Sequence, residues 1–322
     1  MYKKRIGILT SGGDAPGMNA VIRGVVGSII DENTEIFGIQ HGYKGLINGE
    51  VFEIKRSDVA GIINLGGTIL YTARSEEFKT REGLQKAVDV CRKLKLDSVV
   101  VIGGDGSFRG ALELSEYGIG CVGIPGTIDN DVTCTEYTIG FDTAVNTATE
   151  MIDKIRDTAS ANERCSIVEV MGRNSGNIAL NTGIAVGATA ILIPEVKQDF
   201  AKEASDRIKL MQGFGKKHFI VVITEGLIEI NKFAYEIKKN TGIECRTTIL
   251  GHVQRGGSPT VRDRVVASEM ACLASLNLKE NIKNRIIVLK QNKITDIDIN
   301  EIQTFKKDFD FALYKKFLQI LE

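Results

Sequence analysis

The chain has 322 residues, of which 43% are hydrophobic and 25% are charged, and its 41 basic residues match its 41 acidic residues in number. This length predicts two domains of ordinary size, and the balanced charge argues against nucleic acid or an acidic membrane as a partner. No apolar run approaches the roughly 20 residues that span a bilayer, and the basic start precedes too short an apolar segment for a signal peptide. Six scattered cysteines without paired spacing indicate reduced thiols in a cytoplasmic protein, rather than a disulfide frame or a zinc site.

Glycine is frequent in the chain and proline is rare. There are 34 glycines and only 4 prolines, and many of the glycines stand at the ends of apolar runs. This placement predicts tight loops between strands and helices. Because the apolar runs alternate with helical patterns, the sequence predicts an α/β fold built from βαβ units around a parallel sheet.

The first unit begins with a predicted strand at residues 5–10. A loop of small residues follows at 11–17, and residues 18–30 have the apolar spacing of a helix. A strand, a glycine-rich turn and a helix N-terminus together form an anion site, because backbone N–H groups and the helix dipole favour a phosphate. The same pattern also describes a plain tight turn.

Residues 64–75 contain a second glycine pair, followed by Arg74. A glycine pair before an arginine suits a guanidinium that binds a phosphate. An ordinary surface loop explains the pattern equally well.

The third glycine-rich stretch follows the most apolar strand of the chain. Residues 98–102 form a continuous β-branched run, which is typical of a central parallel strand. Glycines and Asp105 follow at 103–107, and a helix is predicted from Phe108. The glycines let the backbone approach a triphosphate, and Asp105 is placed to hold Mg²⁺. The alternative is a structural turn.

Two carboxylates lie close together after the next strand. Residues 121–124 read as a buried strand, and the loop at 125–131 carries Asp129 and Asp131. A loop at the carboxyl end of a parallel strand faces the ligand crevice of an open sheet. One carboxylate is suited to take a proton from a hydroxyl, and the other to bind a metal or orient the first. The alternative is a surface loop with solvated acids.

Two familiar nucleotide motifs are absent. Gly118, Gly120 and Gly123 fit G-x-G-x-x-G, but they precede a strand and open no helix, so the dinucleotide reading fails. No G-x-x-x-x-G-K-[ST] occurs in the chain. An ATP site here would therefore meet the phosphate charge with backbone N–H groups, Mg²⁺ and arginine.

The second half repeats the strand-and-loop pattern. A strand at 166–170 leads to a glycine loop that carries Arg173, and a strand at 219–223 leads to Glu225. A run at 246–250 leads to His252 and two further glycines. Arg173 in isolation reads as a solvated loop residue and His252 as a packed core histidine.

Three stretches resemble signature sequences of bacterial ATP-dependent 6-phosphofructokinases. They are residues 11–20, 103–106 and 125–131, and the last of these reads Pro-Gly-Thr-Ile-Asp-Asn-Asp. The similarity runs over essentially the whole chain. It implies two Rossmann-like three-layer α/β/α domains with mostly parallel sheets and an active site in the cleft between them. The implied larger, ATP-binding domain comprises residues 1–138 and 252–305. The implied smaller domain, which binds fructose 6-phosphate, comprises 139–251 and 306–322.

The resemblance also implies a reaction, which is phosphoryl transfer from MgATP to the 1-hydroxyl of fructose 6-phosphate. Asp129 would be the general base, Thr127 and Arg173 would stabilise the transferring group, and Asp131 would orient Asp129 or assist the metal site. The implied ATP-binding positions are Gly13, Arg74, Ser75, Gly104, Asp105, Gly106 and Ser107, with Asp105 carrying Mg²⁺. The implied fructose 6-phosphate positions are Thr127, Ile128, Asp129, Arg164, Met171, Gly172, Arg173, Glu225, Arg246, His252, Val253, Gln254 and Arg255.

Assembly and regulation are implied as well. In the family, arginines at the positions of Arg164 and Arg246 reach into a neighbouring subunit's site, which implies a homotetramer with shared active sites. A second anion pocket between subunits binds ADP or phosphoenolpyruvate. Its matching positions are Arg23, Arg56, Arg156, Lys216, Lys217 and His218. Three positions depart from the family pattern: Gly27 stands for an arginine, Phe214 for a lysine, and Thr189 for the glutamate that holds the effector's Mg²⁺.

Other functions fit the sequence less well. A pyrophosphate-dependent phosphofructokinase typically carries Asp at the position of Gly106 and Lys at that of Gly126, whereas both glycines here leave room for ATP. A catalytically inactive subunit that only binds effector would not need to retain all four of Asp105, Asp129, Asp131 and Arg173. A lipid or NAD kinase would share Gly-Gly-Asp-Gly but would give residues 125–131 and 252–259 no role.

Overall fold

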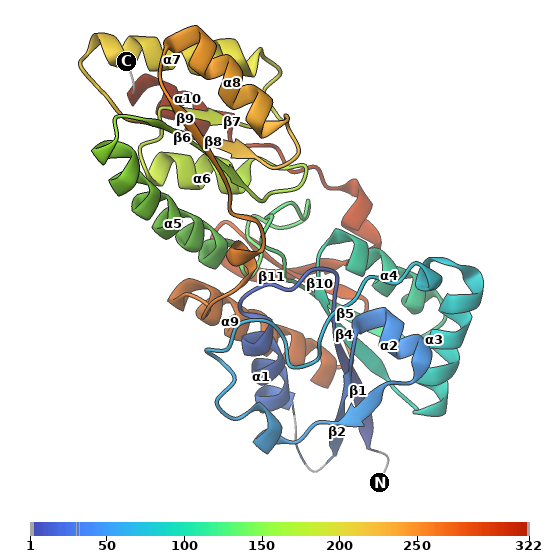
Figure 1. Ribbon diagram of the computed structural model, residues 1–322. Coiled ribbons are helices and arrows are strands. Elements are labelled where there is room, and N and C mark those ends of the chain that lie inside the picture. The colour runs from blue at the N-terminus through green and yellow to red at the C-terminus, as the bar shows by residue number, and fades with distance from the viewer. Residues whose placement is uncertain (1–2, 30, 32, 321–322) are drawn as a thin grey trace. The chain divides into compact units, whose positions relative to one another are not determined.

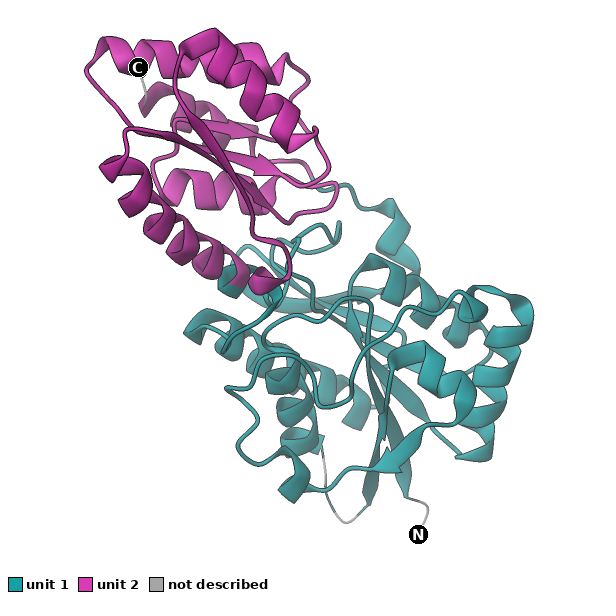
Figure 2. Ribbon diagram, viewed as in Figure 1, with its two compact units in different colours: residues 1–143, 255–307 teal, residues 144–254, 308–322 magenta. Residues whose placement is uncertain are grey.

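The computed structural model describes residues 3–29, 31 and 33–320. The chain divides into two compact units (Figure 2). Unit 1 comprises Met1–Thr143 and Arg255–Lys307, and unit 2 comprises Ala144–Gln254 and Asp308–Glu322. The boundaries therefore fall after residues 143, 254 and 307, where 138, 251 and 305 were expected.

Unit 1 is built on a seven-stranded sheet in the order β11-β10-β5-β4-β1-β2-β3. The pairs β2–β1, β1–β4, β4–β5 and β5–β10 are parallel, and the edge strands β3 and β11 are antiparallel to their neighbours. The strands are β1 (Lys4–Ser11), β2 (Thr34–Ile39), β3 (Val51–Glu53), β4 (Ser98–Gly103), β5 (Gly120–Pro125), β10 (Arg285–Lys290) and β11 (Lys293–Asp298). Every residue of β4 and β5 is buried, as expected for central strands covered on both faces.

Helices cover both faces of this sheet (Figure 1). On one side α1 packs against α9, and Gly24 permits the close approach, because a Cβ there would lie 2.6 Å from the Cβ of Ala271. On the other side lie α2, α3 and α4. The helices of unit 1 are α1 (Met18–Ile29), α2 (Gly42–Asn48), α3 (Arg81–Lys93), α4 (Asp105–Glu116) and α9 (Val261–Lys279), with short 3₁₀ turns at Arg56–Val59, Glu77–Lys79 and Ile299–Thr304.

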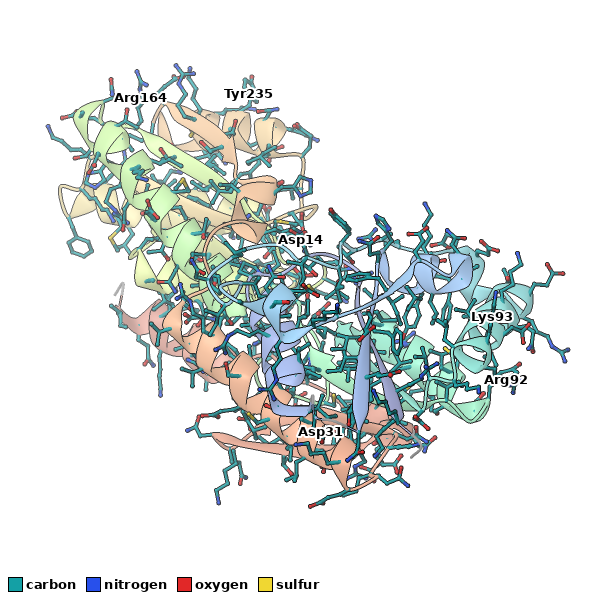
Figure 3. All side chains as sticks on the ribbon, turned by 90° about the horizontal axis from the view of Figure 1, so that it is seen from below. Asp14, Asp31, Arg92, Lys93, Arg164 and Tyr235 are labelled. Carbon is teal, nitrogen blue, oxygen red and sulfur yellow. The ribbon has the colours of Figure 1, made fainter. Side chains whose placement is uncertain are left out.

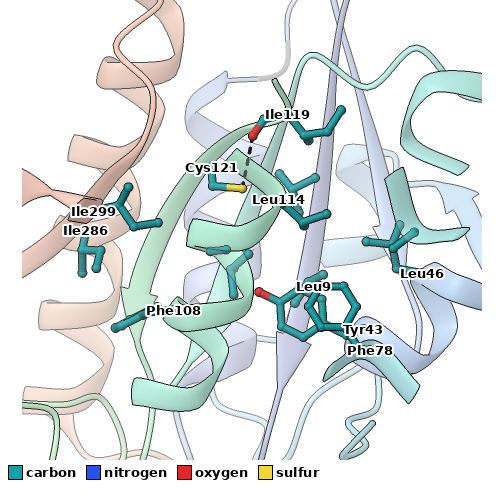
Figure 4. Packing of buried hydrophobic residues seen from close by; sticks show 14 of the residues in the cluster. Leu9, Tyr43, Leu46, Phe78, Phe108, Leu114, Ile119, Cys121, Ile286 and Ile299 are labelled. Carbon is teal, nitrogen blue, oxygen red and sulfur yellow. Dashed lines mark hydrogen bonds between the residues drawn. The ribbon is translucent and has the colours of Figure 1, made fainter. Parts of the chain in front are cut away.

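The core of unit 1 reaches up to the loop after β4. Phe108 is fully buried, and the rings of Tyr43 and Phe78 stack with centroids 4.0 Å apart (Figure 4). The Tyr43 hydroxyl donates a hydrogen bond of 2.6 Å to the carbonyl of Ser107. The packed aromatic cluster thereby fixes the first turn of α4.

The buried carboxylate of Asp263, in the first turn of α9, binds residues 137–143. Asp263 has no exposed surface and accepts hydrogen bonds from the Tyr137 hydroxyl at 2.5 Å, the Gly140 N–H at 2.8 Å and the Thr143 N–H at 2.9 Å. Burial raises the pKa of Asp263, while these donors favour its charged form and oppose the rise. The contacts tie residues 137–143, which follow the 125–131 loop, to the start of a long helix.

Unit 2 has a wholly parallel sheet in the order β7-β8-β6-β9. Its strands are β6 (Cys165–Val170), β7 (Ala190–Leu192), β8 (Phe219–Thr224) and β9 (Cys245–Ile249), and its helices are α5 (Phe141–Ala161), whose first turn belongs to unit 1, α6 (Asn177–Ala185), α7 (Phe200–Gly213), α8 (Ile230–Thr241) and α10 (Phe311–Ile320). A cluster that includes Phe219, Phe233 and Ile208 fills the space beneath α7 and α8. The prediction of an α/β fold with mostly parallel sheets is confirmed.

Candidate active site

Three loops meet at one edge of the unit 1 sheet. In the strand register Ser11 pairs with Gly103, and Gly103 pairs with Pro125. The Ser107 hydroxyl donates to the Ser11 carbonyl at 3.2 Å, and the Gly126 N–H donates to the Gly103 carbonyl at 2.9 Å. The expected convergence of the loops at 11–17, 103–107 and 125–131 is therefore present.

The loop after β4 is shorter than the sequence suggested. The predicted start of the helix at Phe108 is wrong, because α4 begins at Asp105 and Gly104 is its N-cap. An acidic residue in the first turn favours this earlier start, since it faces the positive end of the helix dipole. The first N–H groups of α4 are placed where a helix favours an anion. A Cβ at Gly106 would meet no atom within 4 Å.

Asp105 is the residue of this turn that is suited to a metal. Its side chain is 32% exposed and forms a 2.8 Å ion pair with Arg109. Over the described ranges, no cluster of three His, Cys, Asp or Glu side chains could enclose a metal ion. A single carboxylate, that of Asp105, fits Mg²⁺, which commonly binds one or two carboxylates together with substrate phosphates and water.

The 125–131 loop is held in a defined conformation. Asp129 is 6% exposed, and its backbone N–H donates to the Thr127 hydroxyl at 3.3 Å. The Thr138 hydroxyl donates to the Thr127 carbonyl at 2.6 Å. Asn130, between the two carboxylates, has a positive φ of 49°, a conformation that asparagine adopts more readily than most residues. Ile128 is fully buried, so its side chain anchors the loop.

Lys307 is a part of this site that the sequence did not reveal. Its ammonium donates to the Asn130 carbonyl at 2.7 Å and to Asn130 Oδ1 at 3.0 Å. Burial lowers the pKa of Lys307 to about 8, and the nearby charge of Asp131 opposes that shift. No motif marks this lysine, which lies 177 residues from its partner.

The Arg255 side chain contacts the loop at residues 11–17. Its Nη1 donates to the Asp14 carbonyl at 2.9 Å, and a Cβ at Gly13 would lie 2.5 Å from the same nitrogen. Glycine is therefore needed for this approach. Arg74 is exposed, and the Thr72 hydroxyl joins its segment to the loop through a 2.8 Å hydrogen bond to the Gly12 carbonyl. Ser75 lies beside Arg74, and its hydroxyl accepts a hydrogen bond from the Phe78 N–H.

In unit 2 the loop after β6 is fixed by Glu225. Glu225 Oε1 accepts from the Gly172 N–H at 3.2 Å and from the Arg173 N–H at 2.9 Å. Arg173 has a φ of 57° and an exposed side chain. The carboxylate therefore shapes the turn that presents the Arg173 guanidinium to solvent, while Met171 is buried beside it.

Residues 252–254 have unequal exposure. His252 and Val253 are exposed, so the packed-core reading of His252 does not apply. Gln254 is fully buried, and its Oε1 accepts from the Met171 N–H at 3.3 Å. The Gln254 side chain therefore supports the Met171 loop from within unit 2.

The structure does not bring all candidate phosphate ligands of unit 2 together. Arg164 immediately precedes β6 and is labelled in Figure 3, and Arg246 pairs in register with Ser166. Arg173 follows the other end of β6, whose last residue is Val170. Four residue steps separate Ser166 from Val170, which is about 13 Å at ~3.3 Å per residue. Arg164 and Arg246 thus lie at the opposite end of the sheet from Arg173.

The candidate effector residues form two groups. In unit 2, burial lowers the pKa of His218 and of Lys216, and the positive charge of Arg156 adds to both shifts. Lys217 forms a 2.7 Å ion pair with Glu163. Two of the positions that depart from the family's effector-site pattern lie in unit 2: Thr189 is fully buried and Phe214 is 71% exposed.

In unit 1, the other candidate effector residues lie near Gly27. Arg23 is exposed on α1, and Arg56 Nη2 donates to the carbonyl of Gly27 at 3.5 Å. A Cβ at Gly27 would meet no atom within 4 Å.

Known proteins resemble this chain along nearly its whole length. The family model described as Phosphofructokinase matches residues 5–277. ATP-dependent 6-phosphofructokinases from Clostridioides difficile and Clostridium tetani are 52% and 51% identical over 312 residues, covering 97% of this chain and 98% of each relative. The phosphofructokinase structure from Saccharomyces cerevisiae matches with a TM-score of 0.89 at 32% identity, over 98% of this chain and 50% of that one. The chain belongs to the phosphofructokinase family.

Proposed function

We propose that this protein transfers the γ-phosphoryl group of MgATP to the 1-hydroxyl of fructose 6-phosphate. The observation that carries this proposal is the meeting of an anion-binding helix start, the 11–17 loop and buried Asp129 at one sheet edge. The curated relatives, named as ATP-dependent 6-phosphofructokinases, support the same donor and acceptor.

The nucleotide is assigned to unit 1. Backbone N–H groups at Gly104–Ser107 and Gly13 would meet its phosphates, and the Arg74 guanidinium would bind a phosphate as well. Ser75, beside Arg74, is assigned to the same nucleotide. Mg²⁺ held by Asp105 and phosphate oxygens would neutralise charge on the phosphates. In phosphoryl transfer such positioning and charge stabilisation supply most of the catalysis.

The acceptor hydroxyl is assigned to Asp129. As a general base Asp129 takes the hydroxyl proton while the oxygen attacks phosphorus, and Asp131 orients Asp129 or assists the metal site. Thr127 and Arg173 place a hydroxyl and a guanidinium on the transferring group, where negative charge spreads over the equatorial oxygens. Met171, Gly172 and Glu225 hold the sugar.

The 6-phosphate needs several cations, for which we assign His252, Arg255, Arg164 and Arg246. Within one chain Arg164 and Arg246 lie at the far end of β6 from Arg173. This separation supports an arrangement in which these two arginines serve a neighbouring subunit's site, and we propose a homotetramer from the family resemblance.

We propose a cytoplasmic protein, because its proposed substrates are cytoplasmic. ATP and a sugar phosphate are metabolites of the cytoplasm, and all six cysteines are free thiols. Within the described ranges, no helix combines the length and apolar character that a membrane span requires.

The donor gives the first test. Turnover of fructose 6-phosphate is expected with ATP and to be at least ~100-fold slower with pyrophosphate. Pyrophosphate lacks the nucleoside and third phosphate that would position the transferring group, and losing one preorganised interaction with transition-state charge commonly costs ~10²–10³-fold in kcat. A coupled assay with equal concentrations of the two donors measures this. Gly106→Asp, which fills the open space at the start of α4, is expected to weaken ATP binding more than fructose 6-phosphate binding. Comparable turnover with pyrophosphate in the unmodified enzyme would contradict the assignment of ATP.

Lys307 gives a second prediction, which concerns pH. Lys307→Met is expected to lower kcat by about tenfold, because a lost charge-assisted hydrogen bond costs ~1.5 kcal/mol or more. Since its pKa is lowered to about 8, Lys307 loses its charge as the pH rises through that value. The wild-type kcat is therefore expected to fall on the alkaline side with an apparent pKa near 8. That fall should be absent in Lys307→Met and retained in Lys306→Met, which changes an exposed neighbour. Identical pH profiles in all three proteins would remove Lys307 from the mechanism.

Regulation gives a third prediction. We expect weak or absent activation by MgADP, and inhibition by phosphoenolpyruvate only at concentrations high for the family. Gly27 and Phe214 stand where the family has an arginine and a lysine, so this pocket attracts a phosphate less strongly. Thr189 stands where the family has a glutamate, so it supplies no carboxylate for a metal. An effector shifts a conformational equilibrium only by its differential affinity for the two states.

Saturation curves for fructose 6-phosphate with and without each effector measure this regulation. Gly27→Arg is expected to strengthen the response, since a side chain at this position meets open space. Strong activation of the wild type by sub-millimolar MgADP would show that the three departures do not matter.

A further inference from the structure

Two of the six cysteines stand directly opposite each other in the unit 2 sheet. Cys165 is the first residue of β6, Cys245 is the first residue of β9, and the two are register partners in this parallel pair. Neighbouring strands lie about 4.8 Å apart. That spacing falls inside the ~4.4–6.8 Å range of Cα separations found in disulfides. The backbone therefore already holds the pair at bonding range.

The two side chains also lie on the same face. Cys165 belongs to the core cluster beneath α7 and α8, and Cys245 packs against that cluster. The Cys245 thiol donates to the Ile243 carbonyl at 3.5 Å, and each of the two cysteines is the largest influence on the pKa of the other. Cys165 is fully buried, whereas Cys245 is half-buried on β9, the edge strand of the sheet. A small oxidant in solvent can therefore reach the pair through Cys245.

The contact makes the two thiols chemically unequal. The neighbouring Cys165 thiol lowers the pKa of Cys245, whereas the Cys245 thiol, together with burial, raises the pKa of Cys165. A thiolate is the reactive form of cysteine. By contrast, burial raises the pKa of Cys91 to about 12 and that of Cys134 to about 11, which keeps both as thiols.

We propose that Cys165 and Cys245 form a reversible disulfide on exposure to hydrogen peroxide, and that this modification weakens binding of the sugar phosphate. The Cys245 thiolate attacks one peroxide oxygen, which forms a sulfenic acid and releases water after protonation. The Cys165 sulfur then attacks the Cys245 sulfur, and the second oxygen leaves as water. Two thiols and one H₂O₂ thus give one disulfide and two waters, and each sulfur loses one electron. A dithiol reductant reverses the bond by exchange.

The effect on binding rests on the proposed function. Arg164 and Arg246, both assigned to the 6-phosphate, are the chain neighbours of Cys165 and Cys245. A disulfide brings the two Cβ atoms to about 3.8 Å. Because β6 is held between β8 and β9 whereas β9 is the edge strand, the adjustment falls mainly on β9 and moves Arg246. A phosphate contact is sensitive to such a shift, since an Arg–phosphate pair depends on its geometry.

The chemical step is tested by thiol mapping. The full-length protein is treated with hydrogen peroxide, its remaining thiols are blocked, and its peptides are analysed by mass spectrometry with and without reduction. The wild type is expected to lose two thiols and to yield a Cys165–Cys245 cross-linked peptide. Cys245→Ser should yield no such peptide, whereas Cys272→Ser, which changes an exposed cysteine outside the pair, should yield it as the wild type does. A wild type that forms no Cys165–Cys245 peptide under conditions that oxidise Cys272 would overturn the proposal.

The functional step is tested on the same samples. Oxidised wild type is expected to show a fructose 6-phosphate KM raised about fivefold or more, restored by dithiothreitol, with Cys245→Ser unaffected by either reagent; a change of that size corresponds to ~1 kcal/mol. A disulfide that forms without changing KM would overturn the effect on binding. Absence of phosphofructokinase activity in the reduced protein would instead overturn the proposed function and leave the disulfide standing.

Discussion

Asp129→Asn is expected to lower kcat by about 10²–10⁴-fold, the usual contribution of a general base, while the KM for fructose 6-phosphate changes by no more than a few-fold. Asparagine has the shape of aspartate but cannot take the hydroxyl proton, so the loss falls on the transition state. The buried setting of Asp129 and the hydrogen bond from its backbone to Thr127 should preserve the loop. Steady-state kinetics with both substrates varied measure the separation of kcat from KM.

Asp131→Asn is the matched control, because it removes a carboxylate two residues away in the same loop. We expect it to lower kcat less than Asp129→Asn does. If Asp129→Asn keeps a near-normal kcat while Asp131→Asn loses it, Asp131 is the base and the two roles exchange.

The part of this site that the sequence predicted depends on local patterns. Residues 98–102 are β-branched without interruption, which occurs in strands buried on both faces. Once β1, β4 and β5 are recognised as parallel, their following loops must lie at the same sheet edge. The convergence of the loops at 11–17, 103–107 and 125–131 therefore needed no long-range contact to be predicted.

The start of α4 shows where local patterns fail. The glycines before Phe108 read as a loop, because glycine is unfavourable inside helices. In the structure Asp105 supplies charge at the positive helix end, and the Tyr43 hydroxyl binds the Ser107 carbonyl from the core. The second contact joins residues 64 positions apart, and tertiary packing of this kind overrides propensity.

The remaining features depend on contacts that no sequence pattern encodes. Lys307 reaches Asn130 across 177 positions, and Gln254 reaches Met171 across 83. A lysine next to another lysine looks like a solvated side chain, and Gln254 was expected from the family resemblance to contact the sugar phosphate rather than the Met171 backbone. Only the folded chain shows that each one satisfies polar groups of a functional loop, where an unpaired polar group would be costly.

Arg246→Ala is expected to raise the KM for fructose 6-phosphate by about 30- to 5,000-fold, since truncating one partner of a desolvated charge pair costs ~2–5 kcal/mol. The KM for ATP should change far less, because Arg246 lies in unit 2 and the nucleotide is assigned to unit 1. In the single chain the Arg246 side chain is 63% exposed, and its nearest carboxylate is Glu244 at 3.7 Å. It is therefore available to a phosphate.

Lys238→Ala is the control for general electrostatics, because Lys238 binds Glu244 at 2.6 Å and is not assigned to substrate. A similar KM increase in Lys238→Ala would mean that any nearby cation suffices. The assignment of Arg246 to a neighbouring site is tested by mixing Arg246→Ala with Asp129→Asn under conditions that exchange subunits. A site that combines the intact Asp129 of one chain with the intact Arg246 of another should regain activity, so recovery above the sum of the two parents is expected. If exchange is verified and no activity returns, each chain must supply its own Arg246, despite its distance along β6 from Arg173.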